Sequence, residues 1–353
     1  MDNHITLSEA KSRLDLQGIS YAQLPLGDGF SALITQYGGR LIGPFSGEQG
    51  QSVLWITKEM TDDDAFSTFI KNRSWNLGGE RLWINPELKF FCQSPETFDD
   101  TYTVQSELDP GNYALMQSND GVHLEQSCTV KVLGSGEEKS FFIHRRYAPA
   151  PNPLAYNAEL KDADVGYCGY LQDVYLKDTS PAFPLELEPW ILTQINPGGQ
   201  LVVPYFGDFD SVDYYEPVGA RQQVFDGYAQ LDVTGCDKFK VAYRAAQTFG
   251  RMGYVRHTDE GWQLMIRNYY NDPSAPYLSE PWGELDNRGC SFYCYNDHGL
   301  EDGFAEFENS CPPIGEKAGR SECHSTTSVW FFFGSQYDIG RIMKNLLGID
   351  YKF

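Results

Sequence analysis

The amino-acid sequence predicts an all-β protein, a large antiparallel β-sandwich with a C-terminal helix. Short apolar or alternating runs recur along the 353 residues and are separated by Gly, Pro, Asp and Asn, as is typical of strands joined by turns. Tyr and Phe, at 22 residues each, favour strands over helices. Because no linker or fixed-period repeat divides the chain, we expect one domain over residues 1–353.

The strand pattern is clearest in ten short runs, and only two helices are expected. An acidic cluster at 62–64 weakens the helix predicted over residues 57–69. The segment 337–347 has apolar residues at helical spacing and ends at Gly348. We expect this second helix to cover the sandwich as a lid, with a dimer contact as the alternative. The predicted strands are residues 31–35, 52–56, 101–105, 123–132, 140–147, 154–160, 169–176, 230–233, 262–267 and 327–333.

The charge of the chain limits its partners. The formal net charge is −22, from 49 acidic and 27 basic residues. Binding to nucleic acids or to anionic membranes is therefore disfavoured, because both kinds of binding need clustered Lys and Arg. Neutral mono- or oligosaccharides are compatible with this charge. The sequence contains no Walker loop and no G-x-S-x-G, H-E-x-x-H or G-x-G-x-x-G motif, so no cofactor is predicted.

The N-terminal segment and the cysteines bear on the compartment. Residues 1–18 are polar and lack the apolar core of a signal peptide, and no stretch reaches the ~20 apolar residues of a membrane span. We therefore expect a cytoplasmic protein, or a periplasmic or secreted one if the chain is a trimmed form. The eight cysteines are expected to be buried thiols. A zinc site is the alternative, built from Cys290 and Cys294 with His298, Cys311 or His324.

The first candidate site lies in the segment from Asn76 to Glu87. If residues 79–87 are extended, alternate side chains share one face. A guanidinium, an indole, an amide and a carboxylate in one row suit a sugar, whose ring stacks on the indole while its hydroxyls pair with the polar groups. The alternative is a buried Arg81–Glu87 pair with Trp83 in the core. The candidate binding residues are Asn76, Arg81, Trp83, Asn85 and Glu87.

The second candidate site is the pair Glu306 and Glu308. In a strand both carboxylates fall on one face, with Phe307 on the other. Neighbouring carboxylates repel, so one of them acquires a raised pKa and can serve as a general base near neutrality. The alternative is a solvated acidic edge strand.

Two further segments add weaker candidates for the same site. Asn296 and His298 stand where a strand runs into a turn, and they could reach a ligand from its rim. A solvated histidine is the alternative. Trp190 and Gln194 are an even number of residues apart, so in a strand their side chains would lie on the same face. They could add a stacking surface and an amide.

Two of these segments resemble a known family. Gly78 to Glu87 resembles the GG-x-R-x-W-x-x-P-E signature of poorly characterised bacterial proteins of the galactose-mutarotase-like (aldose 1-epimerase-like) superfamily. The segment 295–312 is similar to their YND and ELE-x-S-P block, and His324 followed by a strand and a terminal helix matches their order. The resemblance spans roughly residues 37 to 349. It implies the supersandwich fold and a sugar site on the concave sheet face, including His324.

The resemblance also implies a reaction, the exchange of sugar anomers. In aldose 1-epimerases a Glu removes the anomeric hydroxyl proton and a His protonates the ring oxygen. Glu308 or Glu306 matches the base, and Arg81 matches the substrate-binding Arg. The family's acid His is absent, since no His lies between His144 and His257, so His144, His298 or His324 would replace it. Two other functions stay open: a hydrolase or lyase using Glu87 with Glu308, and a non-catalytic sugar-binding module.

Overall fold

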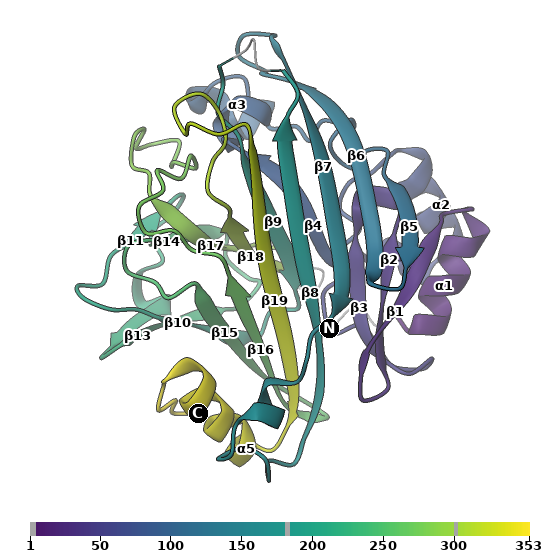
Figure 1. Cartoon of the computed structure of the whole chain (residues 1–353), viewed down its shortest axis with the longest axis vertical. Helices are drawn as coiled ribbons and strands as arrows, with labels where there is room; N and C mark the ends of the chain where they lie inside the picture. The colour runs from purple at the N-terminus through teal and green to yellow at the C-terminus, as the bar shows by residue number, and fades with distance from the viewer. Residues whose placement is uncertain (1–4, 181–183, 300–302) are drawn as a thin grey trace.

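The computed structural model describes residues 5–180, 184–299 and 303–353, which form two large antiparallel sheets (Figure 1). The nine-stranded sheet contains, in spatial order, β1 (Tyr21–Gly27), β2 (Phe30–Thr35), β3 (Leu41–Ser46), β4 (Glu80–Asn85), β9 (Glu188–Ile195), β18 (Ala305–Ser310), β17 (Cys290–Asn296), β14 (Phe239–Arg244) and β11 (Ser211–Asp213). Its strands come from both halves of the chain. The predicted all-β sandwich is therefore confirmed.

The ten-stranded sheet packs against the first. In spatial order it contains β12 (Gln222–Phe225), β13 (Tyr228–Val233), β10 (Gly199–Pro204), β15 (Arg251–Thr258), β16 (Gly261–Tyr269), β19 (Glu322–Gly334), β8 (Val165–Asp178), β7 (Glu138–Pro149), β6 (Gly121–Lys131) and β5 (Ala114–Ser118). Apolar side chains from facing strands form the main core between the sheets, among them Ile191 and Phe307 on one side and Val174 and Phe331 on the other.

The helices cover parts of the outer faces. Two helices, α1 (Leu7–Leu16) and α2 (Asp63–Lys71), lie beside β1–β3 and form a separate core against the outer face of the nine-stranded sheet (Figure 1). At the other sheet, α5 (Gln336–Ile342) and the π-helical turn Met343–Leu347 pack on the outer sides of β15, β16 and β19. The predicted C-terminal helix and its stop at Gly348, which adopts a left-handed conformation with φ 74°, are confirmed.

The N-terminal helix was not predicted, and the expectation of only two helices is wrong. Thr6 and Glu9 form a capping box that satisfies the first turn of α1. Only Leu7, Ala10 and Leu14 are buried in this helix, so its apolar stripe is too narrow to stand out in the sequence. The acidic cluster that weakened the second prediction proves to be the start of α2, because the Asp62 side chain caps it by accepting from the Ala65 amide.

Three predicted strands are not continuous strands. In segment 52–56, alternate residues form isolated bridges to three different partners. Segment 101–105 follows the short helix α4 (Phe98–Thr101), and segment 154–160 begins in the 3₁₀ turn Pro153–Tyr156. Apolar residues in the last two segments fill gaps under neighbouring elements one at a time, and their spacing therefore imitates a strand without a pairing partner.

Candidate functional site

A cavity of about 380 Å³ lies on the outer face of the nine-stranded sheet. Its floor is formed by the middle strands β4, β9, β18, β17 and β14, between the part covered by α1 and α2 and the edge strand β11. Aromatic rings line most of it: Trp75, Trp83, Phe98, Tyr102, Trp190, Tyr215, Tyr295 and Phe304. Asn76 and eight charged residues complete the lining: Arg81, Lys238, Lys240, Glu87, Asp99, Asp297, Glu306 and Glu308.

Strand alternation and register bring these side chains to one face. Arg81 lies opposite Leu192 of β9, which lies opposite Glu308 of β18. One step along, Glu306 lies opposite Tyr295, which lies opposite Lys240 of β14. Directly opposed residues in antiparallel strands project to the same side, so chain segments more than 200 residues apart converge on one cavity. The predicted convergence of Arg81 with the paired glutamates is therefore present.

Arg81 combines an ion pair, ring stacking and unused donors. Its Nη2 lies 2.7 Å from Glu306 Oε1, and its guanidinium carbon lies 4.0 Å from the centre of the Trp83 ring. The side chain is buried, yet Nε and Nη1 have no hydrogen-bond partner among the described residues. A buried donor without a partner is costly, so this guanidinium is suited to a ligand with oxygen acceptors.

Lys240 is a buried ammonium held by two carboxylates. Its Nζ lies 3.1 Å from Glu308 Oε2 and 3.4 Å from Glu87 Oε2. It also lies 4.6 Å from the centre of the Trp190 ring. Burial lowers the pKa of Lys240, but the attraction of Glu308 and Glu87 outweighs it and raises the pKa above its ordinary value. Lys240 is therefore a cation at neutral pH.

Glu308 is the carboxylate most perturbed by this site. Burial, followed by repulsion from Glu306 and Glu87, raises its pKa to about 7 against the lowering effect of Lys240. Trp190 Nε1 donates a hydrogen bond to Glu308 Oε2 at 2.8 Å. A fixed carboxylate with this pKa can both accept and return a proton near neutrality.

A second layer of polar contacts fixes the aromatic wall. Trp83 Nε1 donates to Asp109 Oδ2 at 2.8 Å, and Asp109 forms a buried ion pair with Arg40 at 2.6 Å. Arg40 Nη2 also donates to the backbone carbonyl of Trp75. One ion pair behind the wall thus holds the Trp83 indole and the backbone of Trp75, the two residues whose rings lie beside Arg81.

The structure places seven of the sequence-predicted residues in the lining: Asn76, Arg81, Trp83, Glu87, Trp190, Glu306 and Glu308. The Arg81–Glu87 ion pair considered from the sequence does not form. Arg81 pairs with Glu306 instead, and Glu87 pairs with Lys240. Segment 79–87 is also not extended throughout. Strand β4 ends at Asn85, and Glu87 reaches the cavity from the first turn of α3 (Glu87–Phe90).

Three predicted amides lie outside the lining and are used internally. Asn85 donates to Glu188 Oε1 at 3.0 Å and to Ser310 Oγ at 3.1 Å. Gln194 donates to Asn76 Oδ1 at 2.7 Å, so it supports a lining residue. Asn296 accepts from the Gly235 amide and donates to the Asp237 carbonyl, which fixes the turn before β14. Asn85 and Gln194 share the outer face with the lining residues but lie outside the cavity, whereas Asn296 is paired with Phe239 and Ala305 of the main core and faces inward.

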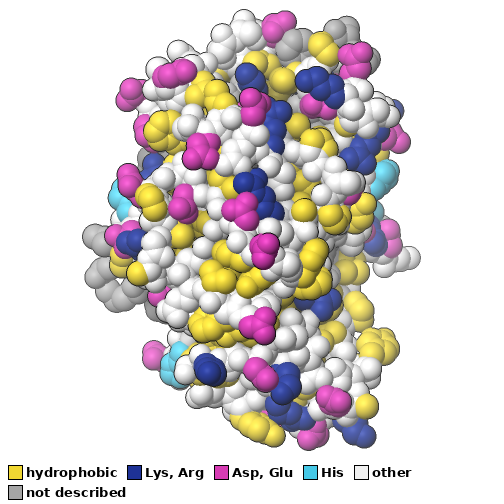
Figure 2. All heavy atoms as spheres, turned by 90° about the vertical axis from the view of Figure 1, so that its left-hand side faces the viewer, with side chains coloured by type: hydrophobic (Ala, Val, Ile, Leu, Met, Phe, Trp, Pro, Cys, Tyr) yellow, Lys and Arg dark blue, Asp and Glu magenta, His cyan; other side chains and the backbone are white. Residues whose placement is uncertain are grey.

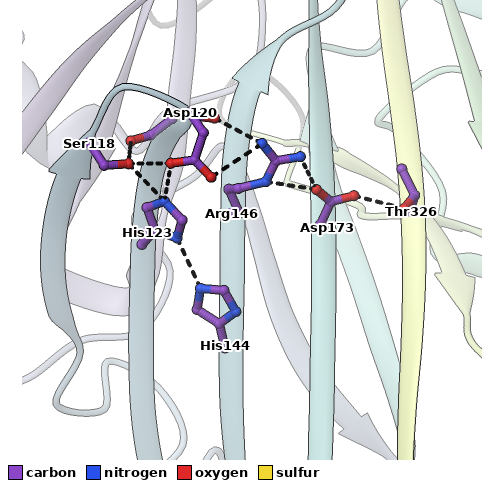
Figure 3. Close-up of polar contacts among 8 residues, drawn as sticks. Ser118, Asp120, His123, His144, Arg146, Asp173 and Thr326 are labelled. Atoms are coloured by element: carbon purple, nitrogen blue, oxygen red, sulfur yellow. Dashed lines mark hydrogen bonds and ion pairs between the residues drawn. The ribbon is translucent and has the colours of Figure 1, made fainter.

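None of the described histidines lines the cavity. His298, at the rim, is mostly exposed and its Nδ1 lies 3.5 Å from Asp297 Oδ1. His324 contacts the ring of Tyr175 in a tilted arrangement on the outer face of the other sheet. Figure 3 shows His144 on the same sheet, with its Nε2 3.0 Å from His123 Nδ1. His144 and His324 are thus separated from the cavity by the whole sandwich, because outward positions of the ten-stranded sheet face away from the nine-stranded one.

Several lining residues were missed by sequence reasoning. Lys240 is the most important, and its only local signal is a lysine alternating with Phe239 and Val241 in an apolar strand. Tyr102 and Tyr215 reach the cavity from connecting segments, where no periodicity marks a face. Tyr295 and Asp297 belong to the segment that sequence analysis singled out, although only its Asn and His were predicted to bind.

Within residues 5–180, 184–299 and 303–353, no group of three or more His, Cys, Asp and Glu side chains is arranged to hold a metal ion. The eight cysteines are free, and all except Cys236 are buried. Across the described part of the chain, no helix is long and apolar enough to span a bilayer. On the face shown in Figure 2, Lys and Arg are interspersed with Asp and Glu and form no continuous basic surface.

Comparisons with known proteins gave structural matches alone, since no family model and no curated protein matches the chain. A galactose mutarotase-like protein from Lactobacillus casei ATCC 334 is similar over 88% of this chain and 100% of its own, at 9% identity and TM-score 0.48. Galactose 1-epimerase from Lactobacillus acidophilus NCFM is similar over 90% and 95%, at 9% identity and TM-score 0.46. A GalM/aldose epimerase homologue from C. elegans covers 90% and 100%, at 10% identity and TM-score 0.37.

Proposed function

We propose that the cavity binds a sugar and that the protein accelerates the exchange of its anomers, with Glu308 as the base. The observation that carries this proposal is the 3.1 Å contact between Glu308 and Lys240 at an aromatic cavity. A proton acceptor and a cationic proton donor then face the same ligand. Indole walls suit the C–H face of a sugar ring, and the free donors of Arg81 suit its oxygens.

The proposed reaction moves two protons and breaks one ring bond. Glu308 takes the proton of the anomeric hydroxyl as the bond between the anomeric carbon and the ring oxygen breaks. The ring oxygen takes a proton from Lys240, which gives the open-chain aldehyde and leaves Lys240 neutral and Glu308 protonated. After rotation about the bond next to the aldehyde, the ring closes on its other side and both protons return. Lys240 takes the place that the family's acid His would fill, because the described histidines lie outside the cavity.

The test is anomer exchange with and without the base. Fresh α-glucose and α-galactose are followed by polarimetry or NMR with the full chain and with Glu308→Gln. We expect acceleration by the wild type and a ~10²–10⁴-fold loss in the variant, the range for removal of a positioned general base. Asp120→Asn, on the outer face of the other sheet, is the matched control and keeps full activity. Exchange at the rate in water would contradict the proposal, and shorter saccharides released from a glycan would indicate cleavage instead.

The activity is also expected to depend on pH. Because the pKa of Glu308 is raised to about 7 by burial and neighbouring carboxylates, its basic form increases as pH rises through that value. The rate of anomer exchange should therefore rise between about pH 6 and pH 8 and then level off. A rate profile already flat above pH 5, measured by the same polarimetric assay, would rule out Glu308 as the base.

A further inference from the structure

The charges that line the cavity do not balance. Three cations, Arg81, Lys238 and Lys240, face five carboxylates, a formal excess of two negative charges. Arg81 is paired with Glu306 at 2.7 Å, and Lys238 with Asp99 at 3.4 Å. Lys240 is shared by two carboxylates. Uncompensated charge of one sign in a partly enclosed cavity attracts a ligand of the other sign.

Asp297 is the lining carboxylate that none of these three cations pairs with. Its Oδ1 accepts from the Tyr295 hydroxyl at 3.2 Å and its Oδ2 accepts from the Gly299 amide at 3.1 Å. These contacts fix the carboxylate at the rim of the cavity. Its basic neighbour is His298, which is largely exposed to solvent and 3.5 Å away.

The aromatic walls favour the same kind of ligand. Ring faces carry a negative quadrupole that attracts cations, and eight rings line this cavity. The protein already places one of its own cations in this way, since Lys240 lies 4.6 Å from the centre of the Trp190 ring. Rings and carboxylates together therefore favour a positively charged group over a neutral one.

The hydrogen-bond donors of Arg81 place a second, independent requirement on the ligand. Its Nε and Nη1 are buried donors without a hydrogen-bond partner among the described residues, and the side chain lines the cavity. A ligand that is only a cation would leave these donors unsatisfied. A ligand that carries oxygen acceptors as well as a positive charge would suit both features of the lining.

We propose that the sugar bound in this cavity is an amino sugar with a free, protonated amine, and that Asp297 binds its ammonium group. This inference rests on the proposed function and narrows its substrate class. A neutral hexose would satisfy Arg81 but leave the excess negative charge in place. An N-acetylated sugar has the same skeleton without the charge, so it is the sharpest comparison.

The experiment compares charged and neutral sugars on the full chain by calorimetric or NMR titration. Glucosamine, glucose and N-acetylglucosamine form one series, and galactosamine, galactose and N-acetylgalactosamine form the other. In at least one series we expect the amine to bind about tenfold more tightly than both neutral sugars. Asp297→Asn should remove most of that advantage, measured as the ratio of the affinity for the amine to the affinity for the matching neutral hexose. Asp100→Asn, a charge removed beside the lining but not in it, is the matched control and keeps the advantage.

The outcomes separate this inference from the proposed function. If neutral hexoses bind and exchange anomers as well as their amino analogues do, the proposed function stands and the amino-sugar assignment is overturned. An amine advantage that survives in Asp297→Asn overturns the role of Asp297. If no sugar of either series binds, both the proposed function and the inference fail.

Discussion

The two faces of strand β4 carry charged residues with opposite surroundings. On the inner face, Glu80 accepts hydrogen bonds from four side chains, Tyr147, Tyr170, Thr193 and Arg267, which come from both sheets. On the outer face, the next residue, Arg81, has one carboxylate partner and two nitrogens without a hydrogen-bond partner among the described residues. Both residues are almost fully buried.

The difference between these faces is that Arg81 lines the cavity, whereas Glu80 lies between the two sheets. Around Glu80 every carboxylate oxygen has a donor and the network joins the two sheets, although Nη2 of its partner Arg267 has no hydrogen-bond partner among the described residues. Around Arg81 the donors exceed the acceptors, while the cavity as a whole carries excess carboxylate. Such unmatched groups lower the stability of the fold. A bound ligand can supply their missing hydrogen-bond and ion-pair partners.

The largest expected effect is on the network around Glu80. Glu80→Gln leaves Arg267 buried without its counter-ion, which is 2.8 Å away in the wild type. We expect the free energy of unfolding, measured by urea denaturation, to fall by ~3–5 kcal/mol. Glu322→Gln, an exposed carboxylate on β19, is the control and should change stability by less than about 0.5 kcal/mol. A loss below ~1 kcal/mol at Glu80 would contradict the assignment of this network as structural.

The next largest effect is expected on sugar binding at Arg81. Arg81→Lys keeps a cation beside Glu306 but loses the planar fork of donors. We expect sugar affinity, measured by calorimetry, to fall about tenfold or more, because each hydrogen bond to a charged group is worth ~1.5–3 kcal/mol. Arg146→Lys on the opposite face of the molecule should leave the affinity unchanged (Figure 3). Equal affinities in wild type and Arg81→Lys would place the sugar elsewhere.

A pair of asparagines on the same face sharpens the distinction. Asn85 bonds Glu188 and Ser310 outside the cavity, whereas Asn76 lines it. Asn85→Ala should lower the free energy of unfolding by ~1–2 kcal/mol, since it leaves buried Glu188 short of a donor, and should not change sugar affinity. Asn76→Ala should lower the affinity for sugar and should lower the free energy of unfolding by less than Asn85→Ala does. If Asn85→Ala lowered sugar affinity and Asn76→Ala did not, the sugar would contact Asn85 and not Asn76.

The smallest effect is expected at His324. This exposed side chain lies against the Tyr175 ring on the far sheet, where Figure 1 places β19 and β8 side by side. His324→Ala should change stability by less than about 0.5 kcal/mol and should leave anomer exchange unaltered in the polarimetric assay. A loss of activity would restore the acid role that the sequence resemblance suggested for this residue.

The sequence by itself determined the sandwich, the C-terminal helix and the face-sharing of Arg81 with Trp83 and of Glu306 with Glu308. Each of these follows from periodicity within one segment, which the backbone geometry of a strand or helix imposes locally. Local patterns failed where an apolar run has no partner strand, as at residues 101–105, and where a helix buries only a few residues, as in α1.

Only the tertiary structure decided which charges meet. Pairing of β14 with β17, of β17 with β18 and of β18 with β9 brought Lys240 to Glu308, and pairing of β9 with β4 brought Arg81 to Glu306. The predicted histidines lie outside the cavity. The tertiary structure also assigned Asn85, Gln194 and Asn296 to internal hydrogen bonds. The physical reason is that strand order and register join segments far apart in the chain, and no pattern within one segment specifies its neighbours in space.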